Sequence, residues 1–344
     1  MYCHGFSLIV QPMNEQPKDI KAGFEPIDLR KFVNPQKTLQ GEPRAQVALT
    51  TLETLWINTG TLCNIECKNC YINSSPTNDQ LVYFAHADAL ALYDEIRQLE
   101  LDTAEIGFTG GEPFMNPQIL DMMEAALKQG FKVLILTNAM QPMQRKAIKQ
   151  GLLGLAATYG DRLALRVSLD HYTKHLHEVE RGENTWDKVV AGLDWLSEHN
   201  FNIAIAGRTC WGESDEKERN GYKQLILNHK WPVEAQNPGQ LILFPEMNEQ
   251  VDVPEITTAC WGILGKSPND IMCATSRMVI KRKGASAPAV LPCTLLPYDA
   301  GFEMGNNLTE SLQVDCGNFD KGAVKLNHPH CAKFCVLGGG SCST

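Results

Sequence analysis

The chain has 344 residues, a formal net charge of -9 at pH 7 and 43% hydrophobic residues, which is ordinary for a globular protein. The acidic balance argues against a nucleic-acid partner, because proteins that grip phosphate backbones are usually basic. No apolar run approaches the ~20 residues that span a bilayer, and residues 1–10 lack the basic region of a signal peptide. We therefore expect a cytoplasmic protein with no membrane partner, in which twelve cysteines favour metal binding over disulfides.

The first fifty residues are polar, carry five scattered prolines and show no sustained hydrophobic period. We expect residues 1–51 to form an N-terminal extension or cap. The segment is too short and irregular to predict a separate peptide-recognition domain.

From residue 52 onward, short apolar runs alternate with segments of helical period. This repetition predicts a parallel sheet with right-handed crossovers, in about six strand–helix units over 52–250. The pattern alone does not separate a partial barrel from a flat doubly wound sheet. The predicted strands span 54–58, 104–109, 132–137, 162–169, 202–208 and 241–244, and the predicted helices span 86–100, 117–129, 143–153, 186–199 and 213–228.

Three cysteines follow the first predicted strand within eight residues: Cys63, Cys67 and Cys70. Structural zinc takes four protein ligands, so a zinc site here needs a fourth ligand from elsewhere in the chain. A four-iron cluster on the same three thiolates keeps one iron open for a substrate or cofactor. Both alternatives remain open at this point, and the open iron predicts a reactive site.

Other polar or flexible residues stand where predicted strands end, which is where ligands gather in barrels and in open parallel sheets. Gly110 and Gly111 let a ligand approach the backbone closely, and the Glu112 carboxylate can accept hydrogen bonds from an ammonium group. Asn138 and Ser168 end the third and fourth strands, and Arg208 ends the fifth strand. For Asn138, strand-end capping is an equally good explanation, and for Arg208 a surface ion pair is one.

Cysteines become frequent after residue 255, while helical periods fade. We place a domain boundary near residue 250, so that 251–344 forms a small cysteine-rich C-terminal domain. Residues 278–281 and 289–292 predict a β-hairpin that leads to Cys293. Zinc is one candidate metal for this domain and an iron–sulfur cluster is the other.

The cysteine spacing, with Tyr71 after the third cysteine and Gly110-Gly111-Glu112 at the second strand end, resembles the radical S-adenosylmethionine (SAM) superfamily. One departure is Asn69, where the family usually has an aromatic or apolar residue. The resemblance implies an α/β fold, a partial (β/α)6 TIM-like barrel with its cluster loop after the first strand. It also implies SAM contacts: the ammonium group at Gly110, Gly111 and Glu112, the ribose at Asn138 and Ser168, and the carboxylate at Arg208.

The tail resembles the start of a SPASM or twitch auxiliary-cluster domain, through Cys273, Gly284 and Cys293. The spacing of the later cysteines departs from that pattern, so we expect one auxiliary [4Fe-4S] cluster rather than two. The resemblance implies that its ligands are Cys260, Cys273 and Cys293, with Cys335 or Cys331 as the fourth.

The resemblance implies an enzyme that reductively cleaves SAM to a 5′-deoxyadenosyl radical, which abstracts hydrogen from a substrate. The substrate is either a small molecule or a peptide, as for SPASM-type maturases. A flavodoxin- or ferredoxin-type reductant is the expected protein partner. The alternative from another class is a non-catalytic iron–sulfur electron carrier or zinc scaffold, which would have no use for the Gly-Gly-Glu motif.

Overall fold

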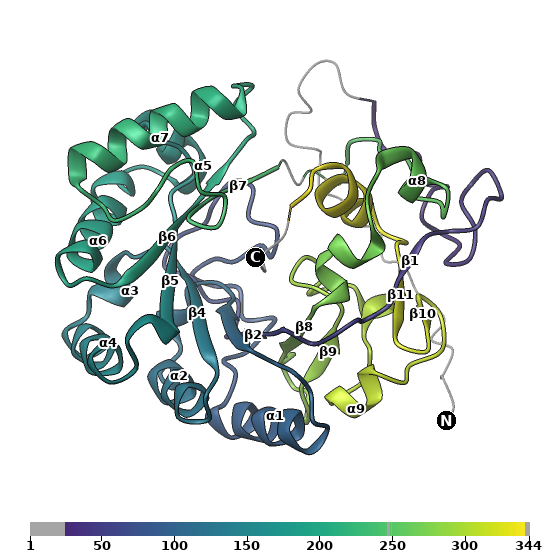
Figure 1. Cartoon of the computed structure of the whole chain (residues 1–344), viewed down its shortest axis with the longest axis horizontal. Coiled ribbons are helices and arrows are strands. Elements are labelled where there is room, and N and C mark those ends of the chain that lie inside the picture. The colour runs from purple at the N-terminus through teal and green to yellow at the C-terminus, as the bar shows by residue number, and fades with distance from the viewer. Residues whose placement is uncertain (1–24, 246–247, 249, 341–344) are drawn as a thin grey trace.

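The computed structural model describes residues 25–340, apart from 246, 247 and 249. It has a larger part, in which helices cover a parallel sheet, and a smaller, more irregular part formed mainly by the chain after residue 250 (Figure 1). Residues 1–24 of the expected N-terminal extension lie outside the described residues.

The larger part is built on six parallel strands whose order in space is their order in the chain. A doubly wound sheet reverses its strand order at a switch point, and no reversal occurs between the first and the sixth of these strands. The predicted α/β partial barrel is therefore confirmed, and the flat alternative is wrong. The strands are β2 (Thr54–Asn58), β3 (Glu105–Thr109), β4 (Lys132–Thr137), β5 (Leu163–Ser168), β6 (Asn202–Arg208) and β7 (Leu241–Phe244).

Helices cover the outer face of this sheet (Figure 1). Their buried faces follow the hydrophobic period, as in the second helix, where Ile119, Met122, Met123, Ala126 and Leu127 are all buried. The helices are α1 (His86–Gln98), α2 (Ile119–Lys128), α3 (Gln141–Gln144), α4 (Lys146–Tyr159), α5 (Lys174–Arg181), α6 (Trp186–Glu198) and α7 (Asp215–His229).

Two helical segments differ from the prediction. The helix expected over 143–153 is two helices, α3 and α4, because Arg145 between them has a non-helical backbone, with ψ of 138°. Helix α5 was not predicted. Its buried residues are His177 and Glu180, so it has no hydrophobic period by which to recognise it.

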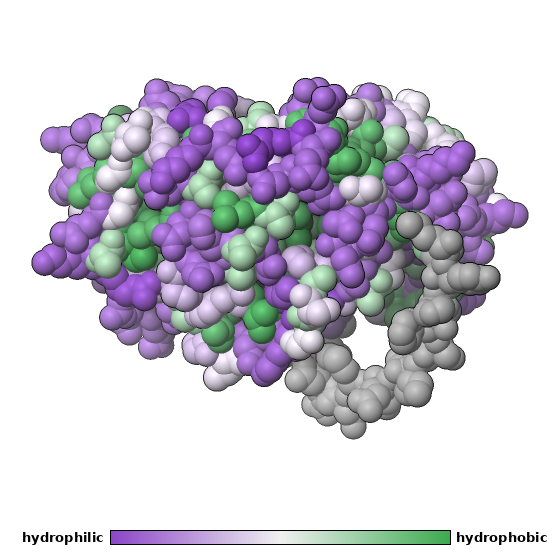
Figure 2. All heavy atoms as spheres, turned by 90° about the horizontal axis from the view of Figure 1, so that it is seen from below, coloured by the Kyte–Doolittle hydropathy of each residue, from purple (hydrophilic) through white to green (hydrophobic). Residues whose placement is uncertain are grey.

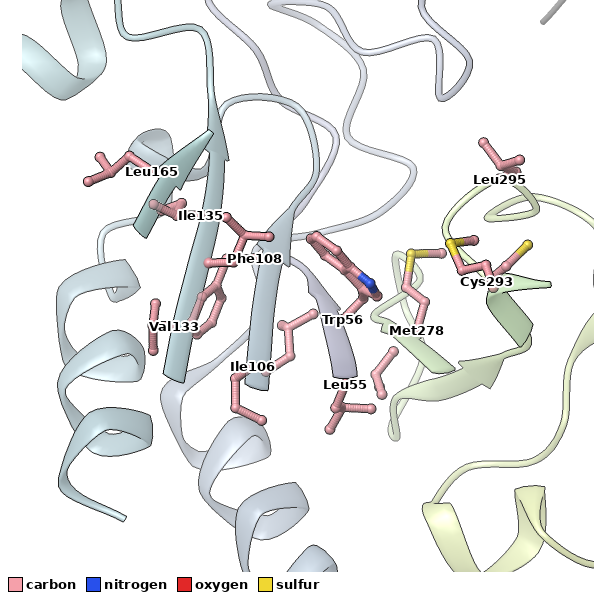
Figure 3. Packing of buried hydrophobic residues seen from close by; sticks show 14 of the residues in the cluster. Leu55, Trp56, Ile106, Phe108, Val133, Ile135, Leu165, Met278, Cys293 and Leu295 are labelled. Carbon is pink, nitrogen blue, oxygen red and sulfur yellow. The ribbon is translucent and has the colours of Figure 1, made fainter. Parts of the chain in front are cut away.

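Trp56 lies in the core where the barrel meets the tail. It is fully buried on β2, between β3 and the strand that carries Met278 (Figure 3). Its indole fits because position 107 is glycine: a Cβ there would lie 2.4 Å from Cε3 of Trp56. The whole of β2 is buried, so the cysteine loop that follows it starts from a rigid strand.

The tail continues the barrel sheet across the proposed boundary at residue 250. The predicted hairpin is present as β8 (Ser276–Ile280) and β9 (Ala289–Leu291), and β8 pairs in parallel with β2. The tail is therefore fixed to the first strand of the barrel. The other tail elements are α8 (Cys260–Leu264), α9 (Leu308–Ser311), β10 (Phe319–Asp320), β11 (Ala323–Lys325) and a π-helix, Cys331–Leu337.

The described N-terminal residues pack on the tail. Strand β1 (Gln46–Val47) pairs antiparallel with β11, and Arg44 forms a buried 2.5 Å ion pair with Glu255. Residues 25–50 thus join the tail to the chain that leads into β2.

The surface is mixed in character. On the face in Figure 2, hydrophobic residues are interspersed with hydrophilic ones. Each helix among the described residues is too short or too polar to cross a membrane.

Candidate radical SAM site and auxiliary cluster site

A cavity of about 1050 Å³, part of it open to solvent, lies at the carboxyl ends of the barrel strands. The cysteine loop forms one wall, and the strand ends form the floor. The structure brings most of the predicted residues together here. Those that line the cavity are Cys63, Cys67, Cys70, Gly110, Gly111, Asn138, Ser168 and Arg208.

The three loop cysteines face this cavity with few protein partners. Burial raises the pKa of Cys63 to about 12 and that of Cys67 to about 11. The Cys63 sulfur lies 3.9 Å from Nδ2 of Asn138, and Cys70 accepts a 3.3 Å hydrogen bond from Ser74 N. Buried thiols of this kind become thiolates when a metal binds them. The donor set therefore fits a metal centre that faces the cavity.

The two glycines fit closely against the start of the cysteine loop. A Cβ at Gly111 would lie 2.2 Å from the carbonyl oxygen of Leu62, and Gly110 has φ of +141°. Gly111 N donates to Gly60 O, and Glu112 N donates to Leu62 O. The glycines are thus required by backbone packing as well as by any ligand.

Glu112 lies just behind the cavity wall and is 2% exposed. Its carboxylate accepts hydrogen bonds from Thr137 Oγ1 (2.9 Å), Asn138 N (2.8 Å) and Phe114 N (3.1 Å). Burial nevertheless raises its pKa to about 7. A carboxylate offers about four acceptor positions, so one remains for a cationic ligand group.

Asn138 is held by the protein itself. Its Nδ2 donates to Asn64 Oδ1 (2.9 Å), and its Oδ1 accepts from Met140 N (3.0 Å). It therefore supports the cysteine loop and caps the end of β4. Ser168 also faces the cavity, at the end of β5.

Two ion pairs in the cavity wall were not predicted. Asp170 pairs with Arg181 at 2.7 Å, and Glu180 pairs with Arg208 at 2.7 Å. Although burial opposes the charged form, Asp170 raises the pKa of Arg181 above its usual value. Glu180 and Arg181 come from the end of α5. The one available signal was their position before Gly182, which has φ of +94° and ends the helix.

Residues 57–218 match the model of the Radical SAM superfamily. These residues form a radical SAM domain. The match begins in β2 and ends in α7, so it covers the cysteine loop and most of the cavity floor.

Curated relatives of the radical SAM domain include two whole-protein matches of limited extent. The chain is 28% identical over 145 residues to the antilisterial bacteriocin subtilosin biosynthesis protein AlbA of Bacillus subtilis (strain 168). It is 27% identical over 145 residues to the mycofactocin maturase MftC of Mycobacterium tuberculosis (strain ATCC 25618 / H37Rv). Each alignment covers 42% of this chain but 30% and 32% of the relatives, so the chain spans about a third of their length.

Solved structures similar to this chain share its fold. Streptococcus suis SuiB bound to S-adenosylmethionine has a TM-score of 0.51 at 15% identity, over 73% of this chain and 62% of SuiB. Native anSMEcpe with bound AdoMet has a TM-score of 0.54 at 14% identity, over 76% of this chain and 80% of that one. Both alignments extend beyond the radical SAM domain.

The radical SAM superfamily uses a [4Fe-4S] cluster and SAM. The cavity residues fit this pair: three buried cysteine sulfurs face it, and the Glu112 carboxylate has a free acceptor position behind it. Cys63, Cys67 and Cys70 would hold the cluster.

A second cavity, of about 280 Å³, lies in the tail and is lined by Cys273, Cys293, Cys331 and Cys335. Burial raises the pKa of Cys273 to about 11 and holds that of Cys331 well above its usual value. Among the described residues, no three His, Cys, Asp or Glu side chains could hold a single metal ion. The four cysteines around one cavity therefore fit a cluster, which spans more space than one zinc ion.

Cys260 is not among the residues that line this cavity. Its sulfur accepts a 3.3 Å hydrogen bond from Thr257 N. A role for Cys260 as a ligand stays a prediction, and both Cys331 and Cys335 are placed beside Cys273 and Cys293.

Proposed function

We propose that this protein is a radical SAM enzyme that abstracts a hydrogen atom from a peptide. The observation that carries the proposal is the convergence of three cysteines, the Gly-Gly-Glu segment and polar strand ends on one cavity. When bound, the cluster and SAM together supply a 5′-deoxyadenosyl radical, and the protein supplies orientation and protection from water.

The chain's own residues then have separate tasks. Cys63, Cys67 and Cys70 hold the cluster at one wall of the cavity. Glu112 accepts a hydrogen bond from the SAM ammonium group, and Ser168 and Asn138 face the ribose. Arg208 uses two of its five N–H groups on Glu180 and Asn69, which leaves donors for the SAM carboxylate.

The wall opposite the strand ends is apolar, which favours an uncharged substrate group. Phe244 and Phe334 stack there with ring centroids 5.8 Å apart, and Leu295 lies beside them. Phe334 lies between Cys331 and Cys335, and Leu295 follows Cys293 by two residues (Figure 3). The substrate wall is thus built from the same segments as the auxiliary cluster site.

The relatives favour a peptide over a metabolite. One is named for the biosynthesis of a bacteriocin and the other as a maturase. A flavodoxin- or ferredoxin-type protein would supply the electron. The number of cysteines in the chain supports a reducing, cytoplasmic location.

Iron and SAM chemistry test the enzyme class. We expect about eight irons per chain after anaerobic reconstitution, in two four-iron clusters, and about half after Cys63, Cys67 and Cys70 are all changed to Ala. The triple variant should no longer cleave SAM with dithionite. A wild-type protein that takes up zinc and no iron would support the zinc-scaffold alternative. Iron without SAM cleavage would support the electron carrier.

Deuterium transfer tests the substrate class. The enzyme would be incubated with SAM, dithionite and either a fully deuterated peptide digest or a deuterated small-metabolite fraction. We expect deuterium in 5′-deoxyadenosine from the peptide arm. Label from the metabolite arm alone would contradict the peptide proposal and leave the radical SAM activity standing.

A further inference from the structure

The segment between the second and third loop cysteines is held by a buried carboxylate. Glu180, at the end of α5, is 2% exposed. Its Oε1 accepts from Asn69 N at 3.0 Å, and its Oε2 accepts from Asn69 Nδ2 at 2.7 Å. Its backbone oxygen accepts from Lys68 N at 2.8 Å. One residue therefore anchors two successive positions of the cysteine loop.

Arg208 completes this arrangement from the end of β6. Its NH1 donates to Glu180 Oε1 at 2.7 Å, and its NH2 donates to Asn69 O at 3.2 Å. The two N–H groups and the side-chain amide of residues 68 and 69 are all satisfied, as is the carbonyl of Asn69. A carboxylate this deeply buried is stable because it is paired and hydrogen-bonded on both oxygens.

The cysteine loop needs such an anchor because little else fixes this part of it. Lys68 and Asn69 are exposed, and the segment has turns but no helix or strand. Asn69 is also the position where the sequence departs from the expected apolar pattern. An apolar residue would fix the loop by packing, whereas asparagine can fix it only through hydrogen bonds.

We propose that Glu180 and Arg208 are positioning residues that clamp Asn69, and so hold Cys67 and Cys70 in the arrangement that binds the cluster. This inference rests on the proposed function, since it assigns the clamp to the cluster loop. It adds residues to the site from α5, which lies outside the cysteine and glycine motifs.

A charge exchange between the two clamp residues tests the proposal. Asn69→Asp places two carboxylates together and removes the amide donor. Asn69→Asp/Glu180→Gln restores one carboxylate and one amide, with the donor and acceptor roles reversed. Glu183→Ala is the control, because Glu183 is exposed and lies just beyond the same helix.

All variants would carry Cys273→Ala, so that the iron measured belongs to the loop. The readouts are the rate of iron release to a chelator under anaerobic conditions, and the electron paramagnetic resonance signal of the reduced protein with and without SAM. We expect Asn69→Asp to release iron about tenfold faster, corresponding to ~1.4 kcal/mol, and to alter the SAM-dependent signal. The double variant should return close to the reference rate, and Glu183→Ala should match it.

The outcomes separate the clamp from the proposed function. Release from Asn69→Asp at the reference rate overturns the clamp, as does a double variant no better than Asn69→Asp. If the reference protein takes up no iron at the loop, the proposed function fails and the clamp fails with it. Because Asn69 is exposed, these variants test the clamp without cutting into the core.

Discussion

At the scale of single residues, Glu112 combines burial with one unused acceptor position. Changing Glu112 to Gln keeps its shape, removes its charge and turns an acceptor toward the donors Thr137 or Asn138 as a donor. We expect SAM to bind about ten- to a hundredfold more weakly, because charge-assisted hydrogen bonds contribute ~1.5–3 kcal/mol. Titration calorimetry on the reconstituted protein measures this, and iron content should not change.

A matched control for this substitution lies on the same strand. Glu105 is at the opposite end of β3, away from the cavity, so Glu105→Gln should leave SAM affinity as in the wild type. Unaltered SAM affinity in the Glu112→Gln protein would remove Glu112 from the site.

Glu218 is a second buried carboxyl, and it weakens the fold. Neither of its side-chain oxygens has a hydrogen-bond partner among the described residues, and burial, together with Glu213 and Asp215, raises its pKa from 4.5 to about 7 against the attraction of Arg219. The unfolded chain therefore ionises at lower pH than the folded one. Stability is lost as pH rises from about 4.5 to about 7.

Glu218→Gln should therefore stabilise the protein above pH 7 and change little near pH 4.5. We expect a gain of about 1–2 kcal/mol, less than the full pKa shift implies, since charges near a helix end are partly screened. Urea unfolding of the apoprotein at pH 5 and pH 8 gives the comparison. An equal effect at the two pH values would show that ionisation is not the cause.

The residues that the sequence predicted at the site are those whose chemistry is local. The cysteine spacing and Gly110-Gly111-Glu112 are short motifs, and the structure places them at one cavity or just behind it. The partner of Arg208 could not be predicted in the same way. Glu180 is 28 positions earlier in a helix without hydrophobic period, and the pair exists only once α5 has packed beside β6.

At the scale of elements, the strands of the barrel were predictable because each is a short apolar run buried on the sheet. The parallel pairing of β8 with β2 was not, since the two strands are more than 200 residues apart and neither sequence specifies its partner. The hairpin was predicted from its own residues. Its attachment to the barrel depends on Trp56 and Met278 packing across the new pair.

The tail elements that surround the second cavity should act as one ligand set. Changing Cys273, Cys293, Cys331 or Cys335 to Ala should each remove about four irons and leave dithionite-driven SAM cleavage intact. Iron analysis and SAM cleavage assays on the four variants test this. Cys316→Ala is the control, because Cys316 is in the same region but does not line the cavity.

Cys260→Ala decides between two ligand sets for this cluster. Full iron content in that variant would leave the four cavity cysteines as the ligands. Loss of about four irons would bring Cys260 back and require α8 to move toward the cavity on binding.

At the scale of the whole molecule, one buried ion pair joins three distant segments. Arg44 donates to Glu255 and to the carbonyl oxygens of Asn34, Lys37 and Leu326. It thereby connects the N-terminal segment, the chain after β7 and the end of the tail. Glu255 also accepts from Phe32 N and Leu39 N. Although burial alone would raise the pKa of Glu255, these hydrogen bonds and Arg44 hold it below its usual value.

Removing Arg44 should therefore destabilise the protein far more than removing a surface arginine. Arg44→Ala leaves a buried carboxylate without its cation and three carbonyl groups without a donor, and we expect a loss of about 3–5 kcal/mol in the free energy of unfolding. Arg30→Ala is the control, because Arg30 pairs with Asp28 at the surface and should unfold as the wild type does. Guanidinium unfolding of both apoproteins measures the difference. Similar midpoints for the two variants would show that the N-terminal segment contributes little to the fold, even though Arg44 bonds to both ends of the tail.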